Sequence, residues 1–373
     1  MADSDCIVIG GGIVGAAMAY GLARRGRAVT MLDQDDEAFR ASRANFALVW
    51  VQSKGLGRPE YAAWSRRSAM LWPELAAELK QVTGIDTGHR RPGGVAPALS
   101  EDELAGKVAA LRQIKREAGN QPFEFEVLER PALDRLLPGL GPKVVGGTYC
   151  PLDGDTNSLR SLRALHVGVA KHGGRYRTGQ TVTAIRGLAG GGARVETAAG
   201  ETFAAPKVVI AAGLGNKVLG AMAGLEVPVR PVQGQVIVTE KAAPLLDLPT
   251  INVRQTDEGG FMLGASEAEV GFDTGTDPAV LGLIARRNLD TFPFLGGLKV
   301  VRTWAGLRVM TPDGFPIYDQ SKSHPGVFVV TGHSGVTTAA AHAFDLAGWI
   351  DEGGIPAQMK ALSTERFHAA PAG

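Results

Sequence analysis

This sequence contains few cysteines and carries almost no net charge. Only two of its 373 residues are cysteines, Cys6 and Cys150, too few for the disulfide framework of a small secreted protein. Neither has a Cys or His at metal-ligand spacing, so we expect no metal site. Lys and Arg number 39 against 38 Asp and Glu, a balance that argues against a nucleic-acid-binding surface. These absences favour a protein of a reducing compartment, the cytoplasm, that binds neither metal nor nucleic acid.

Long uncharged runs are also scarce. Residues 6–23 form such a run, and its length is near the lower limit for a membrane span. However, Asp3 and Asp5 precede it where a signal peptide would carry positive charge, and glycines interrupt it after four residues. We therefore interpret this run as a strand, a turn and a helix, and we expect no transmembrane segment.

Glycine, in contrast, is abundant. The chain contains 50 glycines, about twice the usual share of roughly 7%. They follow no G-X-Y repeat, which excludes a collagen-like protein. They cluster between apolar runs, a pattern that indicates tight turns and places where the backbone approaches another group closely. The length of the chain favours about two domains.

The first glycine cluster has the surroundings of a dinucleotide-binding unit. A buried-strand pattern over residues 6–9 precedes it, a helix is expected over 13–25, and a second strand over 28–32 ends at Asp33. The motif G-x-G-x-x-G is formed by Gly10, Gly12 and Gly15. Such glycines let a pyrophosphate reach the helix N-terminus, here Ile13 and Val14.

Asp33, followed by Gln34, is placed to bind the ribose hydroxyls of the dinucleotide. This acid favours an unphosphorylated ribose, which leaves FAD and NAD as candidates. A second strand–glycine–helix unit near the C-terminus, over residues 327–350, helps to choose between them. NAD needs only one such cradle, whereas a flavin becomes anionic at its N1–C2=O edge on reduction and gains from a second helix N-terminus. The second unit therefore favours FAD.

The intervening sequence predicts further elements. Helices are expected over residues 58–80, over 101–119 with a Ser100/Glu103 capping box, over 158–173 with a cap at Asn157 or Ser158, and over 278–291 with a cap at Asp277. A buried parallel strand is expected near 207–212, and residues 226–305 alternate as in an antiparallel sheet. The fold class is thus α/β and α+β: a Rossmann-like FAD-binding domain (1–80, 150–225 and 306–373) interleaved with an antiparallel-sheet substrate domain (81–149 and 226–305).

Other motifs follow one another in a recognisable order. They are residues 41–45, 181–185, 211–213, 231–235, 304–308 with 311–314, and 332–335. With these motifs the chain resembles the D-amino acid oxidase family of FAD-dependent amine oxidoreductases over nearly its whole length, which implies an FAD-binding domain of the glutathione-reductase type. Residues 307–314 and 333–337 are most similar to a narrower group: the flavin subunits of opine oxidase and hydrogen cyanide synthase, and some D-hydroxyproline dehydrogenases.

The resemblance implies a set of cofactor contacts. Besides the first glycine loop, Asp33 and Gln34, these are Ser42, Ala44, Asn45, Val182, Ala212, Gly213, Arg308, Gly332, His333, Gly335, Val336 and Thr337. FAD is expected to bind without a covalent bond, because no Cys or His near the N-terminal flavin region offers an attachment point.

The resemblance also implies that Arg308 grips the substrate carboxylate, since a guanidinium presents two parallel donors. The alternative is a structural salt bridge. His333 is expected either to tune the charge of the reduced flavin and orient the substrate, or to serve as a structural residue. Further candidates for the substrate pocket are Arg254, Asn252, Gln52 and Met262. Met262 stands where sarcosine oxidase has a lysine that promotes reaction with oxygen, so the electron acceptor stays open.

The chemistry implied is removal of a hydride from a carbon that bears an amine, giving an imine that hydrolyses. The expected substrate is an amino acid or N-substituted amino acid of the D-amino acid, glycine/sarcosine or opine type. Two alternatives stay open: a flavin subunit that passes electrons to a partner, and a 2-hydroxy acid oxidoreductase. An electron-accepting partner or a second copy of the chain is the expected protein partner, and such a partner could bring the protein to the inner membrane.

Overall fold

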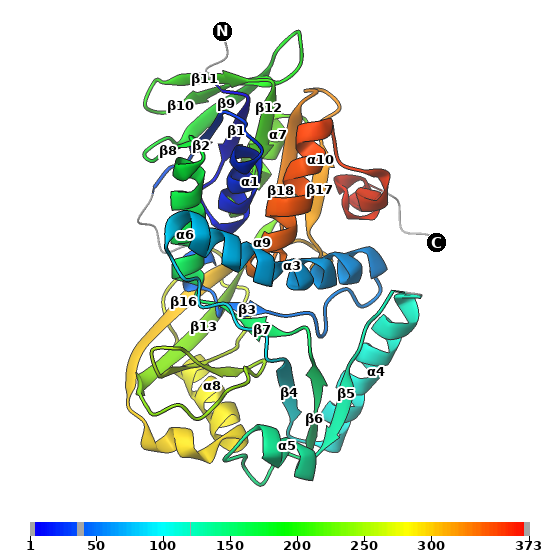
Figure 1. Ribbon diagram of the computed structural model, residues 1–373, viewed down its shortest axis with the longest axis vertical. Helices are drawn as coiled ribbons and strands as arrows, with labels where there is room; N and C mark the ends of the chain where they lie inside the picture. Colours follow the sequence, from blue (N-terminus) through cyan, green and yellow to red (C-terminus); the bar gives the residue numbers. More distant parts are fainter. Residues whose placement is uncertain (1–3, 36–40, 120, 369–373) are drawn as a thin grey trace.

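The computed structural model describes residues 4–35, 41–119 and 121–368 (Figure 1). A six-stranded sheet and a small antiparallel sheet occupy the upper part of Figure 1, and the other antiparallel sheets occupy the lower part, with α3 (Pro59–Thr83) running between the two parts. This mixture confirms the predicted fold class. The residue boundaries of the two domains stay a prediction.

The six-stranded sheet has the order β17-β18-β12-β1-β2-β8. Its strands are β1 (Cys6–Ile9), β2 (Val29–Leu32), β8 (Arg175–Arg177), β12 (Lys207–Ile210), β17 (Ile317–Gln320) and β18 (Val327–Thr331). All neighbours pair in parallel except β17, which is antiparallel to β18. Every residue of β1, β2 and β18 is buried, as expected of short parallel strands covered on both faces. The strands predicted from apolar runs are thus confirmed.

Helices cover this sheet. They are α1 (Ile13–Arg24), α6 (Ser158–Lys171), α7 (Asn216–Met222), and a continuous C-terminal stretch made of α9 (Gly335–Ala341), a π-helical segment (His342–Leu346) and α10 (Ala347–Glu352). The sequence does not predict the π-helical segment. Gly21 of α1 packs directly on the carbonyl of Ala343 in that segment, so the widened turn lies where two helices approach closely. Within the described ranges, no helix is long and apolar enough to cross a membrane.

The larger antiparallel sheet has the order β14-β15-β13-β16. Its strands are β13 (Arg230–Lys241), β14 (Val253–Gln255), β15 (Gly260–Leu263) and β16 (Val300–Met310), and α8 (Pro278–Thr291) packs on it. In the long ladder between β13 and β16, Val232 stands opposite Arg308 and Gly234 opposite Gly306. This register places Arg308 two residues along the ladder, on the same face, from a pair of residues without side chains.

Smaller elements complete the fold. They are α2 (Ala41–Ala44), β3 (Leu48–Val49) paired with β7 (Gly154–Asp155), the sheet β4-β6-β5 (Gly94–Ala98, Gly146–Cys150, Glu126–Glu129), the sheet β11-β10-β9 (Thr202–Ala205, Ala193–Thr197, Val182–Gly187), α4 (Glu101–Glu117) and α5 (Arg130–Leu136). The predicted caps are confirmed: the side chains of Ser100, Asn157 and Asp277 accept hydrogen bonds from Glu103, Arg160 and Ala279 amides.

Candidate active site

The first glycine loop joins β1 to α1 and leaves no room for side chains. Gly10 has φ +113°, and a Cβ there or at Gly15 would clash with backbone carbonyls. Gly12 is the N-cap residue of α1, and as a glycine it has no side chain that could accept a hydrogen bond from the free helix amides. A Cβ on Gly12 would lie 3.0 Å from the Oγ of Ser42, which accepts a hydrogen bond from the Ile13 amide at 2.8 Å. The structure thus brings the glycine loop and Ser42 together.

Asp33 lies at the end of β2, beside the same loop. It is 5% exposed, and its carboxylate accepts hydrogen bonds from the amides of Gly11 and Asp35. Two residues that the sequence analysis missed stand next to it: the Nε2 of His166 lies 2.8 Å from the Gly11 carbonyl oxygen, and the Tyr176 hydroxyl covers the face where a Gly11 side chain would be. They come from α6 and β8, and no sequence motif marks them. Gln34 is exposed.

The second glycine loop packs on the start of α1. Gly332 has φ +155°, and its Cβ would lie 2.8 Å from Pro316. A Cβ on Gly335 would lie 2.8 Å from Val14 and 3.1 Å from Ile13. The N-terminal ends of α1 and α9 therefore adjoin, although more than 300 residues separate them in sequence. Because the two helix N-termini are adjacent, their free amides and positive dipole ends can bind the same cofactor.

The segment after α2 lies on the other side of this cradle. Thr337 Oγ1 accepts a hydrogen bond from the Trp50 amide at 3.1 Å, and the Val336 carbonyl accepts one from Trp72 Nε1. A Cβ on Gly306 would lie 2.5 Å from that of Ala44. The Ala212 amide is bound by Asn216, Gly213 has φ +61°, and Val182 is half-buried at the start of β9.

Two buried polar atoms in this region lack a partner among the described residues. They are Oδ1 of Asn45 and Nε1 of Trp50. Buried polar atoms in folded proteins are almost always hydrogen-bonded. Orphaned atoms beside a side-chain-free cradle fit a bound cofactor with many polar atoms, and the donors present, namely backbone amides and hydroxyls, suit the pyrophosphate, ribose and flavin of FAD.

Arg308 on β16 is a half-buried cation whose hydrogen-bond partners are all neutral. Its guanidinium lies over Gly234, and its Nη1 donates to the carbonyl oxygens of Ser266 at 2.8 Å and Gln233 at 3.2 Å. Within the described ranges no carboxylate forms an ion pair with it, so the structural salt bridge has no partner there. Burial lowers the pKa of Arg308, and the nearby charge of Glu267 opposes that shift.

His333 shares the site with Arg308 and with a residue that the sequence analysis missed, Lys54. Burial, and then the positive charges of Lys54 and Arg308, hold the pKa of His333 well below its ordinary value, so its imidazole is neutral. Its Nδ1 lies 3.0 Å from the Oγ of Ser334, which accepts a hydrogen bond from Lys54 Nζ at 2.6 Å. Lys54 follows no motif, and only the fold brings it here.

Gln52 is engaged within the protein at both ends of its amide. Its Nε2 donates to the carboxylate of Asp153 at 2.7 Å and to the Gly94 carbonyl at 3.0 Å, and its Oε1 accepts from Thr148 at 2.6 Å. Asp153 also accepts from the Val51 amide at 2.5 Å. Burial raises the pKa of this carboxyl to about 7. The hydrogen bonds of Asp153 to Val51 and Gln52 hold in place the segment that leads to Lys54.

Arg254 is similarly engaged. Its Nε donates to the Phe46 carbonyl at 2.6 Å, its Nη2 lies 3.0 Å from Met262 Sδ, and its Nη1 lies 3.5 Å from Asp155. Burial lowers its pKa. Met262 stands opposite Arg254 in the β14–β15 ladder. Asn252 is half-buried, and its carbonyl accepts from the Gly264 amide. No hydrogen bond among the described residues links this group to Arg308.

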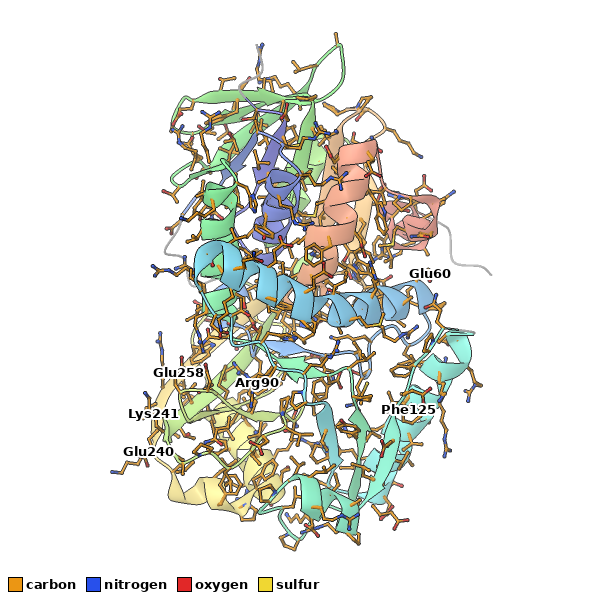
Figure 2. The ribbon with its side chains drawn as sticks, viewed as in Figure 1. Glu60, Arg90, Phe125, Glu240, Lys241 and Glu258 are labelled. Atoms are coloured by element: carbon orange, nitrogen blue, oxygen red, sulfur yellow. The ribbon has the colours of Figure 1, made fainter. Side chains whose placement is uncertain are left out.

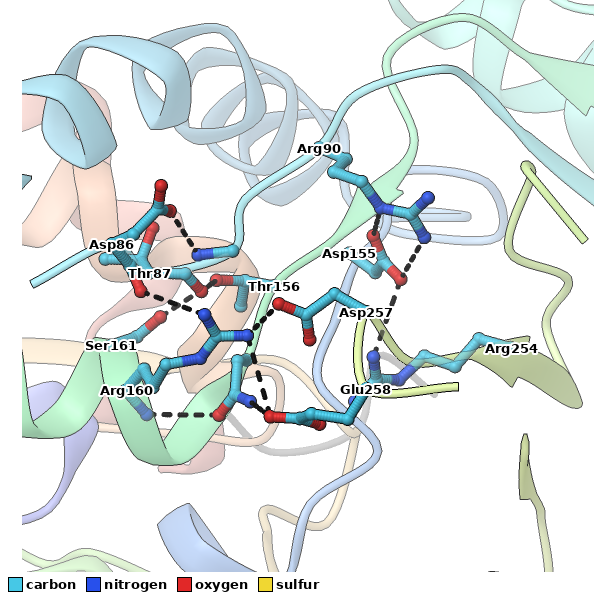
Figure 3. A network of polar contacts seen from close by, with 12 residues as sticks. Asp86, Thr87, Arg90, Asp155, Thr156, Arg160, Ser161, Arg254, Asp257 and Glu258 are labelled. Atoms are coloured by element: carbon cyan, nitrogen blue, oxygen red, sulfur yellow. Dashed lines mark hydrogen bonds and ion pairs between the residues drawn. The ribbon is translucent and has the colours of Figure 1, made fainter. Parts of the chain in front are cut away.

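A polar network continues from Arg254. Asp155 is shared between Arg254 and Arg90, and a second cluster joins Arg160 of α6 to Asp257 and Glu258 in the turn between β14 and β15 (Figure 3). Figure 2 labels Arg90 and Glu258 below α3, beside the antiparallel sheet of the lower part. The network therefore connects the parts of the molecule that carry the glycine loops and Arg308.

Comparisons with known proteins agree with this geometry. The DAO family model, described as FAD dependent oxidoreductase, matches residues 5–349. An opine oxidase subunit from Agrobacterium tumefaciens (strain Ach5) is 45% identical over 372 residues, which cover 99% of both chains. The protein of the same name from Rhizobium meliloti is 42% identical over 369 residues, again 99% of both. The crystal structure of glycine oxidase from Geobacillus kaustophilus matches with a TM-score of 0.88 at 26% identity and covers 98% of this chain and 99% of that chain.

The family match spans most of the chain, and the two glycine loops, Asp33 and the orphaned polar atoms fit FAD. The protein is a flavoenzyme, an FAD-dependent oxidoreductase. The chain belongs to the DAO family of FAD-dependent oxidoreductases.

Proposed function

We propose that this enzyme oxidises the C–N bond of an amino acid or an N-substituted amino acid of the D-amino acid, glycine/sarcosine or opine type. The observation that carries the proposal is Arg308, a half-buried cation with only neutral hydrogen-bond partners among the described residues, beside a neutral His333 and next to the cradle for FAD. A cation that is partly removed from water without an opposite charge is costly. A substrate carboxylate supplies the missing negative charge.

FAD, when bound, accepts a hydride and thus two electrons. We assign its contacts to the glycine loop, Asp33, Ser42, Ala44, Asn45, Ala212, Gly213 and residues 332–337, and we propose that it is held without a covalent bond. Arg308 orients the substrate through its carboxylate. The carbon beside the amine loses a hydride, and the nitrogen lone pair forms the C=N bond of an imine. Water then adds to that carbon, and the C–N bond breaks to give a carbonyl compound and an amine.

His333 is neutral, so its proposed role is to orient the substrate through a hydrogen bond rather than to carry charge. Arg254 and Gln52 are bound to protein groups. We propose that they position the walls of the pocket instead of gripping the substrate. Met262 and Asn252 stand beside Arg254 and are proposed to act with it.

The names of the relatives support two refinements. Both of the most similar relatives described above are named as a subunit of an opine oxidase, which favours an opine-type substrate and a partner chain for this protein as well. The second candidate function is therefore a flavin subunit that passes its electrons to a partner. Oxidation of a 2-hydroxy acid is less well supported, because Arg308 suits either acid whereas these relatives are named for an opine.

The test is anaerobic reduction of the FAD-loaded protein by single candidate substrates. D- and L-amino acids, N-methyl amino acids, N-carboxyalkyl amino acids and 2-hydroxy acids are compared by bleaching of the oxidised flavin absorption. We expect amines with a carboxylate to bleach it and hydroxy acids to leave it unchanged. Reduction by hydroxy acids alone would overturn the proposal. Reoxidation by oxygen and by an artificial dye then shows whether the enzyme needs an electron-accepting partner.

A further inference from the structure

Lys54 is a second cation at the site that holds Arg308. Its ammonium donates to the Ser334 hydroxyl at 2.6 Å, and that hydroxyl lies 3.0 Å from His333. Lys54 and Arg308 both lie close enough to His333 for their charges to lower its pKa. The imidazole thus stands within reach of two cations that come from different parts of the chain, the loop before α3 and strand β16.

The backbone around Lys54 holds this side chain in place. Ser53 and Gly55, on either side of it, have φ +63° and φ +79°, and the Lys54 amide donates to the Val51 carbonyl at 3.1 Å. A side chain on Gly55 would clash with Ala62 of α3. A serine in the left-handed region is strained, so this tight turn is a specific conformation.

Neither cation is matched by an anion in contact. The described residues include no carboxylate in an ion pair with Lys54 or with Arg308: Lys54 donates to a hydroxyl and Arg308 to two carbonyl oxygens. Two carboxyl groups act on these cations through their charges alone: Asp153 interacts with Lys54, and Glu267 with Arg308. Asp153 is bound to Val51 and Gln52, and burial raises its pKa to about 7. Among the described residues, neither positive charge therefore has a carboxylate in direct contact.

We propose that Lys54 binds a second carboxylate of the substrate, so that the enzyme prefers amino diacids in which an amine nitrogen joins two carboxylate arms. One carboxylate pairs with Arg308, the other with Lys54, and the C–N bond lies between them beside His333. An ammonium has three donors, of which Ser334 takes one. This inference rests on the proposed function, which favours an opine-type substrate, and adds the residue that binds the second carboxylate of that substrate.

The experiment compares diacids with monoamides of the same shape. Iminodiacetate is paired with N-(carbamoylmethyl)glycine, and N-(2-carboxyethyl)glycine with N-(2-carbamoylethyl)glycine, so each pair differs by one charge. The FAD-loaded parent, Lys54→Met and Lys54→Arg are tested for the rate of anaerobic flavin reduction, for ligand dissociation constants from the flavin spectrum, and for the flavin midpoint potential. Lys217→Met is the matched control, because Lys217 is an exposed lysine on α7.

We expect the parent to prefer at least one diacid to its monoamide. Lys54→Met should lower kcat/KM for that diacid by about 10- to 100-fold, the worth of a charge-assisted hydrogen bond, while the monoamide changes little. Lys54→Arg should restore part of the preference, and Lys217→Met should match the parent.

Two outcomes would overturn the inference: no diacid preference in the parent, or an equal loss for diacid and monoamide in Lys54→Met. A shift of the midpoint potential with that equal loss would assign Lys54 to the flavin instead. If no amine reduces the flavin, the proposed function fails. The dissociation constants then still decide whether Lys54 binds the second carboxylate.

Discussion

A methyl group at position 234 is expected to displace the guanidinium of Arg308. A Cβ on Gly234 would lie 2.5 Å from Nη1 and 2.6 Å from Cζ and Nη2 of Arg308. Non-bonded heavy atoms settle at about 3.5 Å, so Gly234→Ala pushes the guanidinium away by about 1 Å. The group that must move is the far end of a flexible side chain. The ladder between β13 and β16 therefore stays in place.

The displacement acts on the substrate, because a guanidinium and a carboxylate pair only in a matched geometry. A misplacement of about 1 Å costs up to about 100-fold in rate, so we expect kcat/KM for a carboxylate-bearing amine to fall by about 30- to 100-fold. FAD affinity and the melting temperature should stay close to those of the parent. Anaerobic stopped-flow flavin reduction measures the first quantity, and FAD titration and thermal unfolding measure the others.

Gly282→Ala is the matched control. Gly282 lies in α8 of the same antiparallel unit, and its Cβ would meet nothing within 4 Å. We expect unchanged kinetics and a gain in stability of up to about 1 kcal/mol from the helix propensity of alanine. The reasoning is refuted if Gly234→Ala keeps its kcat/KM within about threefold of the parent, or if it loses FAD and cooperative unfolding together.

Three further predictions concern the surroundings of the site. Asp33→Ala should weaken FAD binding by about 10- to 100-fold, which is the contribution of one charge-assisted hydrogen bond. A fluorescence titration of the apoprotein with FAD measures this change. An unchanged affinity would contradict the assignment of Asp33 to the FAD ribose. Asp153 has its pKa raised from 3.8 to about 7, so its contribution to stability is complete below about pH 4 and is lost as the pH rises through about 7. Asp153→Asn should flatten that decline in urea unfolding at about pH 5 and pH 8. Between these two pH values the decline is at most about 3 kcal/mol, because about two pKa units lie there at 1.36 kcal/mol each. An identical decline in parent and variant would argue against this assignment. Arg254→Met should lower the free energy of unfolding by about 2–3 kcal/mol, because it removes a partner of buried Asp155 and of the Phe46 carbonyl. The order of preference among amine substrates should stay unchanged. An altered preference at normal stability would place Arg254 at the substrate.

Apolar runs, glycines and capping residues predicted the helices and strands whose formation depends on neighbouring residues in the sequence. The strand, glycine turn and helix of the first unit follow from an apolar run and three glycines, and Ser100, Asn157 and Asp277 cap their helices as predicted. The sheet β4-β6-β5 was not predicted strand by strand, because β6 begins with two glycines and β4 contains Pro97, which obscure the alternation of a strand. The π-helical segment has no local signal, since it depends on the packing of Gly21 against Ala343.

The residues proposed for the site from the sequence are those that motifs mark, and their roles stay predictions. The glycine loops, Asp33, Arg308 and His333 belong to motifs, and the structure places them around one cradle. Lys54 lies 280 residues from Ser334 in sequence, and its approach depends on the turn before α3. His166 and Tyr176 reach Gly11 from α6 and β8 in the same way. Contacts between distant segments leave no periodicity or spacing in a single sequence, so such residues emerge only from the fold.

The charge balance of the site decides what His333 can do. A general base works best when its pKa is near the working pH, and burial with two neighbouring cations keeps the pKa of His333 far lower. His333 is therefore a poor acceptor for the proton of an ammonium substrate, so the proposed reaction requires the free amine. The same neutrality leaves Lys54 and Arg308 as the two positive charges that the proposed diacid would neutralise. A protonated imidazole would add a third charge that no described carboxylate in contact offsets, so its role is to donate or accept a hydrogen bond that orients the substrate.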